Sequence, residues 1–136
     1  MNQNLLAAAI ETPHTLRWAV KVGRATFEVY VDKWAVPRPW PAEITVYISA
    51  GIDSRGRVPK DLGSLDESSL VVEFKYTSDR DNYAVFEPLG DRLSSPIRTT
   101  YIPFELLPDG DYKTLWIAVE WTSTGPGVFR RQPDKC

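Results

Sequence analysis

Cysteine and histidine are almost absent from the 136-residue sequence. Its single cysteine is Cys136 and its single histidine is His14, beside Pro13. One cysteine cannot form an internal disulfide bond. One cysteine with one histidine cannot fill the four positions of a tetrahedral zinc site. A disulfide framework and a Cys/His zinc centre are therefore excluded, and the low cysteine count favours a reducing compartment, so we expect a cytoplasmic protein.

Long apolar runs and strong net charge are missing as well. No apolar stretch approaches the ~20 residues that a membrane helix requires. The longest one near the start, residues 5–10, lacks a basic flank and is short for a signal peptide. The net charge is only −2, which creates no large field toward nucleic acid. We therefore expect a soluble protein with neither a membrane nor a nucleic-acid partner.

Several families of catalytic motif are also missing. The sequence contains no G-x-S-x-G elbow, no G-x-x-x-x-G-K-[ST] phosphate loop and no G-x-G-x-x-G fingerprint. His14 precedes the first clear strand pattern, and Cys136 lies far from it in sequence. We therefore expect a protein that is not an enzyme and that carries no cofactor.

Strict two-residue alternation of apolar and polar side chains is what the sequence has in abundance. Leu16, Trp18, Val20 and Val22 alternate with polar or small residues, which is typical of a half-buried strand. Gly23-Arg24 then separates this run from a second alternating run, which predicts a β-hairpin. Similar runs predict eight strands, at 16–22, 27–31, 44–48, 70–77, 83–87, 98–104, 112–121 and 128–131.

The strand pattern predicts one domain. We expect an N-terminal lead-in over 1–14, in which the first ten residues form either a short helix or an edge strand. A single β-sandwich domain follows over 15–132, with a C-terminal tail over 133–136. Seven or eight short strands with regular turns predict an all-β, antiparallel Greek-key sandwich.

A short segment before the 112–121 strand sharpens this prediction. Leu107-Pro108-Asp109-Gly110-Asp111-Tyr112 resembles the tyrosine corner of immunoglobulin-like and fibronectin-type-III-like sandwiches, in which a tyrosine bonds back to the upstream chain. The resemblance covers about six residues and implies an immunoglobulin-like fold without implying a function. The sequence departs from antibody domains because it has no paired Cys…Trp…Cys framework.

The candidate binding residues come from the order of the strands. If consecutive strands alternate in direction, the loops at 33–42, 78–82 and 105–111 share one end of the sandwich. That end would gather aromatic and charged residues together with Asn82: Trp34, Arg38, Trp40, Asp79, Asp81, Asp109 and Asp111. The alternative is that these are ordinary turn residues, and that the tryptophans beside prolines pack against their own domain.

This loop end supports two kinds of binding module. The residues 37–41, Pro-Arg-Pro-Trp-Pro, suit a protein–protein contact in which an exposed tryptophan is the anchor. Aromatic rings beside carboxylates suit a carbohydrate, and several Asp oxygens suit Ca²⁺. We expect a protein partner first, with the small ligand as the alternative. Unpaired sheet edges also make a homodimer plausible.

One catalytic alternative remains. Pro59-Lys60-Asp61, followed by Glu73-Phe74-Lys75, can be read as P-x-D…E-x-K, which resembles the metal-binding signature of restriction-type nucleases. The resemblance implies that the two carboxylates hold Mg²⁺ while the lysine polarises water. However, Glu73 and Lys75 fall on the polar face of an alternating strand, which is the ordinary place for charged side chains.

Overall fold

The computed structural model describes residues 2–50, 59, 62–63, 65–90, 94–108, 113–122 and 125–132. These residues form nine strands of one sheet, in the spatial order β3-β2-β1-β4-β8-β5-β6-β7. All pairs along this order are antiparallel, while the short β9 runs parallel to β1. The strands are β1 (Asn2–Glu11), β2 (Thr15–Val22), β3 (Ala25–Asp32), β4 (Glu43–Ser49), β5 (Leu70–Arg80), β6 (Tyr83–Pro88), β7 (Thr100–Pro103), β8 (Thr114–Trp121) and β9 (Arg130–Arg131).

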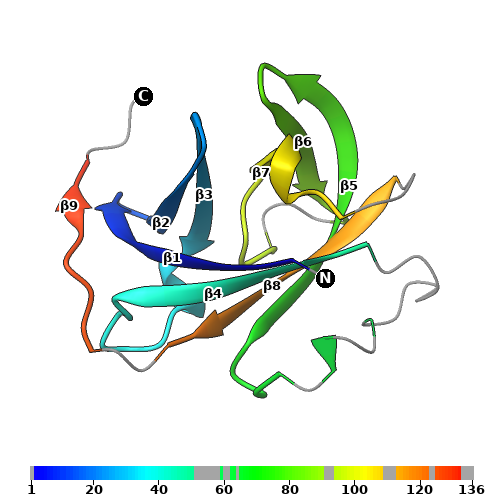
Figure 1. Cartoon of the computed structure of the whole chain (residues 1–136). Helices are drawn as coiled ribbons and strands as arrows, with labels where there is room; N and C mark the ends of the chain where they lie inside the picture. Colours follow the sequence, from blue (N-terminus) through cyan, green and yellow to red (C-terminus); the bar gives the residue numbers. More distant parts are fainter. Residues whose placement is uncertain are drawn as a thin grey trace.

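The sheet curls into a nearly closed barrel-like layer, visible in Figure 1. Its two end strands, β3 and β7, come together, and Val31 forms a bridge with Ile97 just before β7. Closure follows from the accumulated twist of the strands, and it protects edges that would otherwise lie open. The all-β antiparallel fold expected from the sequence is confirmed.

The alternating residues face the inside of this layer. In β2 and β3 the fully buried side chains include Leu16, Trp18, Phe27 and Val29. The predicted hairpin is also present, since Val22 pairs with Ala25 across the two-residue turn. Gly23 has a φ of 59°, a backbone conformation that glycine adopts without steric cost.

The N-terminal segment differs from the sequence prediction. Residues 2–11, expected to be a lead-in with a helix or an edge strand, form β1 in the interior of the sheet. The first half of β1 pairs with β4 and the second half with β2, with a register irregularity between Ala8 and Ile10. Leu6 and Ile10 are buried. Because the outward positions Leu5, Ala7 and Ala9 are also apolar, the segment shows no two-residue period.

Strand β4 ends and strand β5 begins at opposite ends of the sheet. Both strands pair antiparallel with β8, which lies between them, so β4 and β5 run in the same direction. Two side chains of the connection, Leu62 and Leu65, pack on the outer face of the sheet against Tyr47 and Trp116. This second apolar cluster explains why β4 and β8 are buried on both faces.

Strand β5 also departs from its expected pattern at one end. The alternation that buries Phe74 continues to Tyr76, yet Tyr76 is 41% exposed. Its ring packs edge-on against Phe86, its partner in β6, and the pairing of β5 with β6 shifts register only after it, between Tyr76 and Ser78. Among the described residues, no helix is long and apolar enough to cross a membrane.

The outer cluster makes a testable contribution to stability. Leu62 is only 2% exposed, so Leu62→Ala removes buried methyl groups and is expected to lower the free energy of unfolding by about 2–5 kcal/mol. Val128, 89% exposed, provides the control, since Val128→Ala should change it by less than about 0.5 kcal/mol. Urea unfolding measures both. Equal small effects would contradict packing of Leu62 on the sheet.

Candidate functional site

The candidate site lies along the seam where the end strands β3 and β7 of the sheet meet. At one end of this seam, the Asp32 N–H donates to the Pro96 carbonyl at 2.9 Å, and the Arg98 N–H donates to the Tyr30 carbonyl at 3.0 Å. At the other end, the Thr26 N–H donates to the Tyr83 hydroxyl at 2.9 Å. Among the described residues, no backbone hydrogen bond crosses the seam between these ties. The unpaired middle of the seam leaves a groove on the outer surface.

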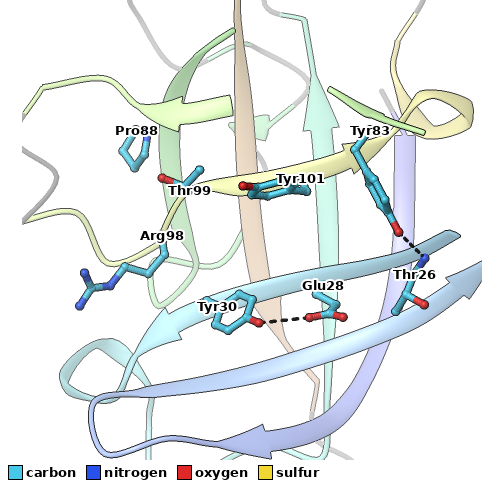
Figure 2. Close-up of a pocket in the computed structure, with 8 residues that line it drawn as sticks. All are labelled: Thr26, Glu28, Tyr30, Tyr83, Pro88, Arg98, Thr99 and Tyr101. Carbon is cyan, nitrogen blue, oxygen red and sulfur yellow. Dashed lines mark hydrogen bonds between the residues drawn. The ribbon is translucent and has the colours of Figure 1, made fainter. Parts of the chain in front are cut away.

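The groove has a volume of about 630 Å³ and draws its lining from both end strands and from β6. Thr26, Glu28 and Tyr30 are alternate residues of β3, and they point outward because their neighbours Phe27 and Val29 point into the core. Figure 2 shows Tyr101 above the groove, Tyr30 and Glu28 below it, and the Tyr83–Thr26 hydrogen bond at one end. The lining residues are Thr26, Glu28, Tyr30, Tyr83, Pro88, Arg98, Thr99 and Tyr101.

The two charged residues of the groove are both paired with charges of opposite sign. Glu28 accepts a hydrogen bond from Arg17 at 2.7 Å, and Arg17 also donates to the Tyr30 hydroxyl at 2.8 Å. The Nε of Arg98 donates to Asp32 at 2.8 Å. The groove therefore offers aromatic rings and hydroxyl groups with little net charge.

Trp34 stands just beyond the Arg98 end of the groove. It belongs to the 3-10 turn η1 (Lys33–Ala35) that follows β3, and its side chain is 69% exposed. Its indole N–H donates to Asp32 at 3.1 Å. Asp32 is only 3% exposed, so one buried carboxylate holds both Trp34 and Arg98.

The other two predicted residues of this loop behave differently from Trp34. Trp40 is half-buried and packs edge-on against Phe129, with ring centroids 6.1 Å apart. The guanidinium of Arg38 lies 5.1 Å from the centre of the Trp40 ring, and the Lys33 amino group lies 5.3 Å from it. Trp40 therefore serves the packing of its own domain, which was the alternative interpretation of the sequence.

The predicted grouping of loops at one end does not hold. Tyr83, which follows the turn at Asp81, bonds to Thr26 near the start of β3, whereas Trp34 follows the end of β3. The two loops thus lie at opposite ends of the same strand. The parity argument failed because β8 lies between β4 and β5 and pairs antiparallel with both, so β4 ends and β5 begins at opposite ends of the sheet.

Two of the predicted aspartates at the second end are described: Asp79 is a strand residue near the end of β5, and Asp81 is a turn residue. Asp81 has a φ of 54° in the two-residue β5–β6 turn. The exposed Asp79 accepts a hydrogen bond from the Tyr76 hydroxyl at 2.9 Å, and this bond raises the pKa of Tyr76. Asp109 and Asp111 lie outside the described residues, as does Tyr112 of the predicted tyrosine corner.

The nuclease-like set can be placed only in part. Glu73 and Lys75 alternate with the buried Phe74 and so lie on the outer face of β5, opposite Trp116 and Thr114 of β8. Asp61 lies outside the described residues. Within the described part of the chain, no group of three or more His, Cys, Asp or Glu side chains could hold a metal ion.

A smaller hollow lies at the Trp34 end of the barrel, where η1 meets β1. Its volume is about 320 Å³, and Glu11, Lys33 and Arg131 contribute to its lining. Lys33 donates a 2.8 Å hydrogen bond to Glu11, and this bond lowers the pKa of the carboxyl group. The ion pair attaches the start of η1 to β1 and so helps to fix the position of the Trp34 loop.

Sequence reasoning missed the groove itself. Its three tyrosines, Tyr30, Tyr83 and Tyr101, come from three strands, and the seam that unites them is a contact between elements far apart in sequence. The available signal was an aromatic ring on the outward face of an alternating strand, where a polar residue is more usual. Tyr30 and Tyr101 both carry that signal.

Comparison with known proteins assigns this chain to no family. No protein-family model matches the chain, and neither the curated proteins nor the solved structures yield a significant match.

The buried carboxylate that links the groove to Trp34 can be tested. Asp32→Ala removes the acceptor of two side-chain donors and is expected to lower the free energy of unfolding by about 1–3 kcal/mol. Asp79→Ala is the matched control, because Asp79 bonds to Tyr76 at an exposed position. This variant should change the free energy of unfolding by less than about 0.5 kcal/mol. If urea unfolding gives the two variants the same midpoint and slope, Asp32 does not hold the site together.

Proposed function

We propose that this protein is a non-enzymatic binding module whose groove between β3 and β7 takes a small, neutral, hydroxyl-rich ring, in chemical terms a carbohydrate unit. The observation that carries the proposal is the lining: three tyrosines from three strands surround a groove whose charges are already paired.

The size of the groove supports a small ligand. Ligand pockets usually have volumes of roughly 300–1,000 Å³, and the groove has about 630 Å³. Tyrosine supplies both an apolar ring face for stacking and a hydroxyl group for hydrogen bonding. The hydroxyls of Thr26 and Thr99 add further donors and acceptors beside the rings.

The charge arrangement supports a neutral ligand. Glu28 is paired with Arg17 and Arg98 with Asp32, so a charged ligand would have to compete with an existing ion pair. Burying an unpaired charge is costly, whereas a hydroxyl group can bond to these groups without displacing their partners.

The exposure of Trp34 favours a second candidate, the protein-contact module expected from the sequence. Tryptophan is enriched among the residues that dominate binding energy at protein interfaces, and Trp34 is 69% exposed. A homodimer through unpaired edges receives less support, because β3 and β7 lie against each other.

For the fold, we propose a Greek-key connection as the finer description of the antiparallel sheet, while the immunoglobulin-like sandwich expected from the sequence stays a prediction. The spatial order β3-β2-β1-β4 supports it, since a Greek key places its fourth strand beside its first.

The proposed carbohydrate site predicts that Tyr101 contributes to the affinity for a sugar and that Tyr76 does not. Tyr101 lies in the groove and is 39% exposed, while Tyr76 lies outside it and is 41% exposed. We expect Tyr101→Ala to weaken binding of a neutral oligosaccharide about tenfold through loss of ring contact. Tyr76→Ala should leave the affinity unchanged. Calorimetric titration with cello-, malto- and chito-oligosaccharides measures this.

The same titration followed by two-dimensional NMR shows where the sugar lies. Amide signals of residues 26–30 and 98–101 should shift, and those of residues 44–48 in β4 should not. The proposal fails if no oligosaccharide shifts the groove signals at millimolar concentration, or if the two alanine variants bind equally well.

A further inference from the structure

We infer that the groove is one end of a longer binding track along β3, and that Trp34 is its second subsite, so that the ligand is a linear neutral glycan. The inference rests on the proposed function and extends it. It assigns a ligand-binding role to Trp34 within the carbohydrate site and gives the ligand a direction and a length.

The outward face of β3 provides the track. Thr26, Glu28 and Tyr30 are alternate, partly exposed residues of one strand and share its outer side, while the next alternate residue, Asp32, is buried and bonds to Arg98 and Trp34. At about 3.3 Å per residue, Thr26 and Tyr30 lie about 13 Å apart along the surface. This distance exceeds a single sugar ring, and Trp34 follows beyond Asp32.

Trp34 is held in place for contact with a ligand. Its indole N–H is fixed by the buried carboxylate of Asp32, which also holds Arg98 of the groove lining. The ring nevertheless remains largely exposed. An exposed aromatic side chain that is already ordered loses little conformational entropy when a ligand stacks on it.

The two ends of the groove differ, and this gives the track its direction. At one end the Tyr83 side chain crosses the seam to bond to Thr26, whereas at the other end backbone hydrogen bonds of Asp32 and Arg98 close the seam, and the Arg98 side chain lines the groove (Figure 2). A chain whose first unit fills the groove therefore continues over Arg98 toward Trp34. The same geometry disfavours an extended peptide that pairs with the strands. The hydrogen bonds at both ends of the seam hold β3 and the β7 side too close together to admit another strand, which requires about 4.8 Å on each side.

The test compares oligomer length in four proteins. Cello- and malto-oligosaccharides of two, four and six units are titrated by calorimetry into the wild type, Trp34→Ala, Tyr101→Ala and Leu5→Ala. Leu5 is an exposed apolar residue of β1 and serves as the control. In the wild type and in Leu5→Ala we expect the six-unit chain of the preferred series to bind about tenfold more tightly than the two-unit chain.

Trp34→Ala should abolish this gain with length while leaving the affinity for the two-unit chain unchanged. Tyr101→Ala should weaken all lengths together. If the wild type shows no gain with length, or if Trp34→Ala weakens short and long chains equally, the track is wrong while the groove stands. If no saccharide of any length binds, the groove and the track both fail.

Discussion

The incomplete closure of the sheet between β3 and β7 is the constraint on which the rest of the account depends. The curl of the sheet brings its two end strands together, but the ladder is not completed along their whole length. Hydrogen bonds at the two ends of the seam hold the barrel shut. Between them, backbone groups of β3 face the open groove, where water or a ligand can satisfy their hydrogen bonds. The outward side chains on either side of this gap become the walls of the candidate site.

The closure also explains why Trp34 and the groove are parts of one feature. Asp32 is the last residue of β3, and its backbone N–H and its side chain both take part in the seam. The carboxylate is buried because the segment before β7 lies against it. The same closure that forms the groove therefore fixes the first exposed residue beyond it.

Two-residue alternation was sufficient to locate most of the strands. It worked for β2, β3 and β8, because one face of each carries a continuous row of large apolar side chains. It failed for β1, where Ala7 and Ala9 are apolar although they point outward, and for Tyr76, which packs edge-on against Phe86 yet remains 41% exposed. In both places the alternation of residue types does not record how much of each side chain is covered by its neighbours.

The candidate site was harder to predict because its geometry depends on contacts distant in sequence. Trp34 and Trp40 stand in the same proline-rich stretch, yet one is exposed beside the seam and the other packs on Phe129 of the C-terminal segment. Asp79 and Asp81 were grouped with them on the assumption that directions alternate from strand to strand. The position of β8 between β4 and β5 breaks that assumption. No residue in or near the loops indicates in the sequence that β8 pairs with both strands.

Amide hydrogen exchange along β3, measured by NMR, tests the partial closure most directly. The account predicts slow exchange at Asp32 and Arg98, whose N–H groups bond across the seam, and at Val29, which pairs with Trp18 in the ladder to β2. Glu28 lies in the unpaired stretch, and its amide should exchange much faster than that of Val29. If Glu28 is as strongly protected as Val29, the seam is fully paired and the groove does not exist in solution.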